Sequence, residues 1–181
     1  MKQYTWIILI AVILIGGGLI YEFYGNNKVN SNTSSIKNNN LVAINSIAPQ
    51  FSVPTISGQQ FSLTAYKGKT VVMFGMFGSC TDCIPEGQAL NQIQKTFGSK
   101  VAVIGLDVLN GEPASALEDY EQQADVNIPL ATYNQTVINE YKLTQPEITY
   151  IINPDGKVAY ASQSFISEAN LQAQVNKVIN V

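Results

Sequence analysis

The sequence contains no arginine and no histidine; all ten of its basic residues are lysines, and it has only two cysteines. Without histidine the chain cannot form a Ser-His-Asp triad or a Cys-His pair, and it cannot bind a metal or a c-type haem through imidazole. Without arginine, and with a net charge of −3, it lacks the usual cationic groups of nucleic-acid and phosphate sites. We therefore expect no nucleic-acid partner and no metal site.

Hydrophobic residues make up 46% of the 181 residues and charged residues only 13%. This proportion is sufficient for a buried core and excludes a wholly disordered chain. The composition changes along the chain and divides it into three parts: an apolar segment over residues 1–24, an Asn- and Ser-rich segment over residues 25–40, and a domain over residues 41–181.

The apolar segment has the length and composition of a membrane anchor. It has no charged residue between Lys2 and Glu22, and a helix over residues 4–21 would span ~27 Å of a hydrocarbon layer of roughly 30 Å. Aromatic residues stand at both ends, and Lys2 favours a cytoplasmic N-terminus. The segment predicts a single-pass protein of the cell membrane, with its N-terminus in the cytoplasm and its domain outside.

Two other interpretations of this segment remain open. A cleaved signal peptide would give a secreted protein, although no A-x-A-like cleavage site is present. A buried core helix is disfavoured because the apolar run is not amphipathic. The segment that follows, residues 25–40, contains seven asparagines and only Val29 and Ile36 as large apolar residues. It cannot bury enough apolar surface to fold, so we expect a flexible tether.

Apolar runs and turn signals predict an α/β domain with a mixed sheet over residues 41–181. The expected strands are a hairpin at 51–53 and 60–63, two fully buried strands at 70–77 and 101–108, and a second hairpin at 148–152 and 158–161. Helices are expected after each buried strand, ending near Gly98 and Ala124. A short helix with Asn134 as its N-cap and a last helix with Ser167 as its N-cap follow.

Cys80 and Cys83 follow a predicted buried strand and open a predicted helix. There the Cys80 sulfur would lie near unpaired N–H groups of the first turn, which stabilise a thiolate, the nucleophile of disulfide exchange. The two-residue gap places Cys83 within reach for an intramolecular disulfide. These features favour redox chemistry. A purely stabilising disulfide, two free core cysteines and half of a metal site are the alternatives; a zinc site needs two further Cys or His ligands, which the chain lacks.

Four segments carry a resemblance to a known family: IAPQF at 47–51, FSL and YKGK within 61–69, the Cys-x-x-Cys motif, and TQP at 144–146 followed by ITYIINPDGKV at 148–158. Together they resemble the thioredoxin superfamily, specifically the membrane-anchored thiol–disulfide oxidoreductases of the TlpA/ResA type. The resemblance implies a thioredoxin-like fold: a central mixed sheet flanked by helices, with an N-terminal β-hairpin extension and an inserted strand–helix segment. It also implies a redox-active disulfide in place of a cofactor, protein thiol and disulfide substrates, and a membrane protein as electron donor or acceptor.

The resemblance also implies roles for three further residues. Pro146 matches a cis-proline beside the active site, which would expose the peptide groups of Gln145 to a substrate chain lying across Cys80. Glu86 matches a glutamate that is linked to thiol proton handling in ResA-type proteins. It follows Cys83 by three residues, so on a helix the two side chains would lie on the same face. A half-buried carboxyl there, with a raised pKa, could relay protons to Cys83. An ordinary trans proline and an ordinary first-turn glutamate are the alternatives.

Two departures from the family pattern leave the reduction potential open. Ser79 stands where the family usually has an aromatic residue, and Glu147 stands where it commonly has threonine. The negative charges of Glu147 and Asp82 oppose thiolate formation at the cysteine pair and favour basic or polar partners.

We therefore expect an extracytoplasmic, membrane-tethered thiol–disulfide oxidoreductase that reduces secreted or membrane-attached proteins, with cytochrome c maturation as the family's common setting. One alternative is a peroxiredoxin-like thiol peroxidase, because Ser79, Cys80 and Thr81 resemble its nucleophile region. That family uses an arginine to polarise the peroxide, and this chain has none. Another alternative is a binding module that keeps a vestigial disulfide on a thioredoxin scaffold.

Overall fold

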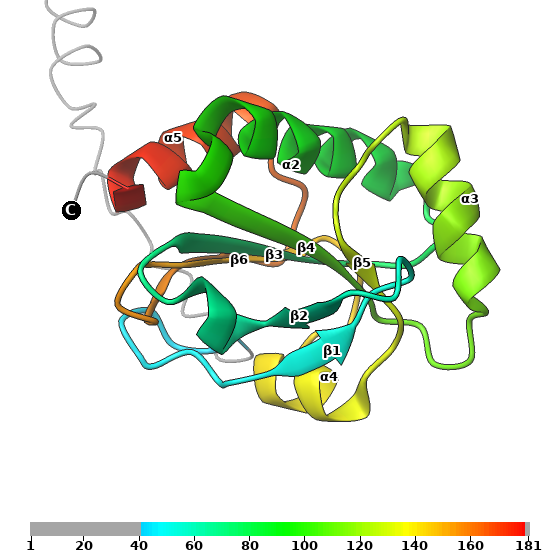
Figure 1. The fold of residues 1–181 in the computed structure, drawn as a ribbon, viewed down its shortest axis with the longest axis horizontal. Helices are drawn as coiled ribbons and strands as arrows, with labels where there is room; N and C mark the ends of the chain where they lie inside the picture. The colour runs from blue at the N-terminus through cyan, green and yellow to red at the C-terminus, as the bar shows by residue number, and fades with distance from the viewer. Residues whose placement is uncertain (1–40, 180–181) are drawn as a thin grey trace, which may run out of the picture. The chain divides into compact units, whose positions relative to one another are not determined.

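A computed structural model describes residues 41–179 of the chain (Figure 1). All of these residues belong to one compact unit. The predicted membrane anchor at residues 1–24 and the predicted tether at residues 25–40 lie outside the described residues, so both stay predictions. Within residues 41–179, no helix has the length and apolar character needed to cross a membrane.

The centre of the domain is a mixed sheet of five strands in the order β5-β4-β3-β6-β7. The strands are β3 (Thr70–Met76), β4 (Val101–Asp107), β5 (Leu130–Ala131), β6 (Ile148–Ile152) and β7 (Val158–Ser162). Strands β3, β4 and β5 are parallel, whereas β6 runs antiparallel to both of its neighbours.

Strand β3 is central because its sequence suits burial on both faces. All seven of its residues are buried, and it pairs with β4 on one side and with β6 on the other. Continuous apolar runs are typical of such strands, and the predictions at 70–77 and 101–108 are confirmed. The two-residue strand β5 was not among the expected elements, since two residues carry no recognisable period.

Helices cover both faces of the sheet, and the sheet separates the hydrophobic core into two parts (Figure 1). On one face, α2 (Ile84–Phe97), α3 (Ala114–Ala124) and α5 (Glu168–Ile179) enclose a core built on alternate residues of β3 and β4. On the other face, α4 (Gln135–Tyr141) packs together with an antiparallel hairpin of β1 (Ser52–Pro54) and β2 (Gln60–Ser62). The predicted mixed sheet flanked by helices, with an N-terminal hairpin extension, is confirmed.

Short 3-10 turns join several of these elements. They are η1 (Leu63–Tyr66), η2 (Thr81–Cys83) and η3 (Gly98–Lys100). The helix expected to open at the cysteines therefore begins as the turn η2 and becomes α-helical at Ile84. Pro85 lies in the first turn of α2, where its missing N–H has no helical partner to lose.

The predicted caps of the last two helices are both present. The Asn134 side chain accepts a hydrogen bond from the N–H of Val137 at 3.1 Å, and the Ser167 hydroxyl accepts one from the N–H of Asn170 at 3.4 Å. Each bond satisfies one of the backbone donors that a helix N-terminus leaves unpaired.

Replacing Asn134 with alanine should lower the free energy of unfolding by about 1 kcal/mol, because the seven-residue helix α4 loses its side-chain cap. Urea denaturation of the oxidised protein measures this change. Asn134→Ser is the control, since serine caps helices about as well as asparagine. Equal destabilisation by serine and alanine would show that the cap contributes nothing.

Candidate active site

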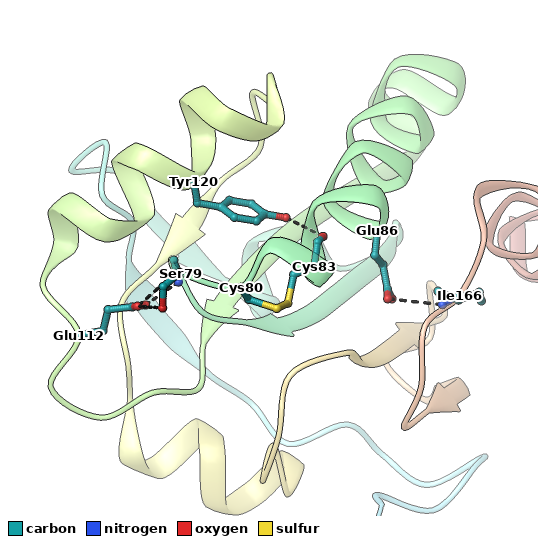
Figure 2. The surroundings of a disulfide bond; sticks show 8 residues. Ser79, Cys80, Cys83, Glu86, Glu112, Tyr120 and Ile166 are labelled. Atoms are coloured by element: carbon teal, nitrogen blue, oxygen red, sulfur yellow. Dashed lines mark hydrogen bonds between the residues drawn. A yellow bond between two sulfur atoms is a disulfide. The ribbon is translucent and has the colours of Figure 1, made fainter.

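The two cysteines lie where the chain leaves β3 and enters α2, and a disulfide joins them (Figure 2). The Cys80 N–H donates to the carbonyl of Phe77 at 3.0 Å, and the Cys83 N–H donates to the carbonyl of Cys80 at 3.2 Å. These turns bring the two Cα atoms to 5.3 Å. The disulfide predicted from the spacing is therefore present, and the alternative of two free core cysteines is excluded.

The two sulfur-bearing residues differ in accessibility. Cys80 is 8% exposed, whereas Cys83 is completely buried. Both precede α2, so they lie at the positive end of its dipole, which favours a thiolate. A molecule approaching from solvent meets Cys80 first, which makes Cys80 the candidate nucleophile and Cys83 the candidate resolving residue.

A carboxylate from a distant loop binds the two residues that precede Cys80. Glu112 accepts a hydrogen bond from the N–H of Gly78 at 2.5 Å, and bonds from the N–H and hydroxyl of Ser79 at 3.3 Å each (Figure 2). Gly78 also lies against α3, since a Cβ there would come within 2.4 Å of the Ala116 carbonyl group. Glu112 was missed in the sequence because Gly111-Glu112-Pro113 indicated only the start of a helix.

Glu86 is completely buried on α2, one turn beyond Cys83 (Figure 2). The Thr149 hydroxyl donates to one carboxyl oxygen of Glu86, and the N–H of Ile166 donates to the other at 3.4 Å. Burial raises the pKa of Glu86 from 4.5 to about 7; the two hydrogen bonds oppose the rise, and the charge of Glu147 adds to it. The carboxyl is fully buried, rather than half buried as expected, and its role in proton transfer stays a prediction.

A second buried carboxyl, Asp107, lies at the end of β4 beside the end of β3. Its Oδ1 accepts the N–H of Leu109 at 2.7 Å. Burial, more than the charge of Glu112, raises the pKa of Asp107 to about 6. Asp107 was not predicted, because an acidic residue at the end of an apolar run is also typical of a strand that reaches the surface.

The prediction of a cis-proline at Pro146 is wrong: residues 41–179 contain no cis peptide bond. The sharp turn into β6 is made one residue later, at Glu147, whose φ of 61° lies in the left-handed region. The Glu147 N–H then donates to the carbonyl of Gly75 in β3 at 2.8 Å. The Gln145 side chain donates to the carbonyl of Gln163 at 3.1 Å. Gln145 and Pro146 thus precede β6 at the edge of the sheet where β3 ends and the redox segment begins.

The folded protein binds a proton at Glu86 more tightly than the unfolded chain does. The free energy of unfolding therefore falls as the pH rises. The contribution of Glu86 is fully present below pH 4.5 and is lost as the pH rises through about 7. Replacing Glu86 with glutamine, which cannot ionise, should reduce the stability difference between pH 5 and pH 8. The reduction should be on the order of 2–3 kcal/mol, because one pKa unit corresponds to about 1.4 kcal/mol.

Urea denaturation of the oxidised protein at both pH values measures this difference. The contribution of Asp107 is common to both proteins and cancels in the comparison. Exposed Glu118 on α3 offers the control substitution Glu118→Gln, which should leave the pH dependence unchanged. An unaltered pH dependence in Glu86→Gln would contradict the burial of an ionisable Glu86 carboxyl.

Residues 44–161 match the AhpC/TSA family. The chain is 24% identical over 158 residues to thioredoxin-like protein YneN of Bacillus subtilis, covering 87% of this chain and 86% of that relative. It is 28% identical over 119 residues to the thiol-disulfide oxidoreductase ResA of Geobacillus thermodenitrificans, covering 65% and 67% of the two chains.

The fold is also similar to a solved structure, a thiol:disulfide interchange protein of the thioredoxin family from Chlorobium tepidum. The TM-score is 0.66 at 21% identity, over 76% of this chain and 99% of that one. The likeness confirms the thioredoxin-like architecture of sheet and helices. With its Cys-x-x-Cys disulfide, the chain belongs to the AhpC/TSA family of thioredoxin-like proteins and is a thiol–disulfide oxidoreductase.

Proposed function

We propose that the protein is an extracytoplasmic, membrane-tethered reductant of protein disulfides, acting on secreted or membrane-attached proteins such as apocytochromes c. The observation that carries the proposal is the disulfide between Cys80, which is 8% exposed, and the completely buried Cys83, with the buried Glu86 carboxyl one turn away. The uncharged run between Lys2 and Glu22 supports the membrane location, and the similarity to proteins named thiol-disulfide oxidoreductase ResA supports the exchange of disulfides.

In the proposed reaction the Cys80 thiolate attacks one sulfur of a substrate disulfide. A mixed disulfide forms, and the other substrate sulfur leaves as a thiolate that takes up a proton. The Cys83 thiolate then attacks the Cys80 sulfur, which closes the Cys80–Cys83 disulfide and releases the second substrate thiol. Two electrons pass from the pair to the substrate, and a membrane protein acting as electron donor restores the dithiol.

Glu86 supplies the proton acceptor that the buried Cys83 needs. A thiol surrounded by apolar groups loses its proton reluctantly, because burial disfavours the thiolate. A neighbouring carboxyl whose pKa is about 7 takes up and returns a proton near neutral pH, where general acid–base catalysis is most effective. We assign Glu86 this role for Cys83 in both directions of the exchange.

The substrate chain would lie along the segment that leads into β6. Gln145 and Pro146 stand at the edge of the sheet where β3 ends, and Glu147 is bonded to β3 through the carbonyl of Gly75. Asp82 is exposed within the redox motif. Two acidic residues beside the cysteine pair favour substrates with basic or polar residues next to the reacting cysteine.

The variant Cys83→Ser should accumulate mixed disulfides with substrate proteins in intact cells, because the resolving thiol is missing. Cys80→Ser is the matched control and should trap none, since it lacks the nucleophile. Non-reducing gels followed by identification of the trapped proteins measure the difference.

We expect the trapped proteins to be secreted or membrane-attached, and to include the membrane protein that supplies electrons. A trapped set of purely cytoplasmic proteins would overturn the extracytoplasmic location. Equal trapping by both variants would overturn the assigned roles of the two cysteines.

The reduction potential of the full-length protein, measured in glutathione and dithiothreitol buffers, should lie near or below the value of about −270 mV found for thioredoxin. A value between about −180 and −120 mV would instead identify a disulfide-forming oxidant or an isomerase. If Cys80 and Cys83 cannot be converted between disulfide and dithiol, the result would support the alternative of a binding module. Fast consumption of peroxide without added disulfide would support the peroxidase, for which the chain lacks the arginine that polarises peroxide.

A further inference from the structure

Tyr120 reaches from α3 to the first turn of α2, where Cys83 is the N-cap (Figure 2). The tyrosine is 1% exposed, and its hydroxyl donates a hydrogen bond to the carbonyl oxygen of Cys83 at 2.9 Å. The partners are 37 residues apart in the sequence. The bond therefore ties the backbone of the second redox cysteine to a different helix.

Gly87 makes room for this contact. A Cβ at Gly87 would lie 2.1 Å from the Tyr120 hydroxyl oxygen and 3.1 Å from the ring carbon that carries it. Real Cβ atoms do not approach an oxygen so closely, so only glycine at this position lets the hydroxyl reach the Cys83 carbonyl. Glycine inside a helix weakens the helix relative to alanine, and here the contact with Tyr120 occupies the space that it leaves.

The hydroxyl is held as a donor. Burial, followed by the charge of Glu86, raises the pKa of Tyr120 above its ordinary value, so the phenol keeps its proton at any physiological pH. A carbonyl oxygen has two lone pairs. The Cys83 carbonyl can therefore accept Tyr120 in addition to the first bond of the helix, which an N-cap carbonyl ordinarily accepts.

Both backbone polar groups of Cys83 are thus engaged on opposite sides. Its N–H donates to the carbonyl of Cys80 at 3.2 Å, and its carbonyl is held by Tyr120. Because the peptide groups on both sides of the Cys83 Cα are held, the backbone keeps the Cβ of Cys83 on the side of Cys80 that the disulfide requires. The resolving sulfur is kept near the sulfur that it must attack.

We propose that Tyr120, in the space left by Gly87, is a positioning residue that holds Cys83 for its attack on the mixed disulfide at Cys80. The inference rests on the roles proposed above for the two cysteines. In that step the Cys83 thiolate forms a bond to the Cys80 sulfur, the Cys80–substrate bond breaks, and the substrate sulfur leaves as a thiolate and takes up a proton. Positioning raises the effective concentration of the attacking sulfur and stabilises the disulfide relative to the dithiol.

Tyr120→Phe removes the hydroxyl and keeps the ring. The equilibrium constant for oxidation of the pair by glutathione should fall about fivefold, which makes the potential about 20 mV more positive because a tenfold change corresponds to 29.6 mV. The glutathione mixed disulfide at Cys80 should persist about fivefold longer, measured by acid quenching and mass spectrometry of the full-length protein.

Tyr141→Phe is the matched control. Tyr141 is equally buried, and its hydroxyl donates to the carbonyl of Pro49 at 2.6 Å, in the core on the other face of the sheet. Its loss should lower the melting temperature much as Tyr120→Phe does and leave the potential and the mixed-disulfide lifetime unchanged. An unchanged potential in Tyr120→Phe, or an equal shift in both variants, would show that Tyr120 is only structural.

A second pair of variants tests the contact apart from the chemistry. Gly87→Ala should lower the melting temperature in the wild-type background, because the new Cβ meets the Tyr120 hydroxyl. Combined with Tyr120→Phe it should cost less or become neutral, since the closest clash is gone and alanine favours a helix. If Gly87→Ala lowers the melting temperature equally with Tyr120 and with Phe at position 120, the proposed contact between Gly87 and the Tyr120 hydroxyl is wrong. If the wild-type pair fails to cycle with glutathione, the proposed function fails while these melting temperatures still report on the contact.

Discussion

The site depends on a single constraint, the burial of β3 between two hydrogen-bonded neighbours. All seven residues of β3 are buried. The strand is paired with β4 along its whole length and with β6 over residues 71–75. Its end is therefore fixed relative to β4 and β6, and the redox segment begins within four residues of that end. Because α2 packs back across the sheet, the chain must turn sharply there, and this turn brings Cys80 and Cys83 together.

The residues around the turn come from segments far apart in the sequence, and each fixes a different part of it. Glu112 binds the peptide groups before Cys80, Tyr120 binds the carbonyl of Cys83, and Glu86 is itself held by bonds from two later segments. Backbone polar groups that leave regular structure inside a core need such partners, because an unpaired buried group is costly. The partners that satisfy this requirement here also surround the reacting sulfurs.

Prediction from the sequence succeeded where a local pattern carries the physics. The buried strands appear as continuous apolar runs, and the cap at Asn134 depends on a residue three positions away. Tyr120 and Gly87 gave no such signal, because their contact joins two helices and exists only once these pack. The cis-proline prediction failed for a related reason: a family pattern does not reveal that Glu147, one residue later, makes the turn.

The balance of charge around the pair bears on the direction of electron flow. The dipole of α2 favours a thiolate at Cys80, whereas the Glu112 carboxylate, bonded to the neighbouring residue Ser79, disfavours it. Glu86 becomes negative as the pH rises through about 7, and its charge then also disfavours the Cys80 thiolate. A thiolate that is less stabilised makes the dithiol form less stable relative to the disulfide, and so makes the pair a stronger reductant. The acidic surroundings, which set this protein apart from its family pattern at Glu147, therefore support the proposed role as a donor of electrons.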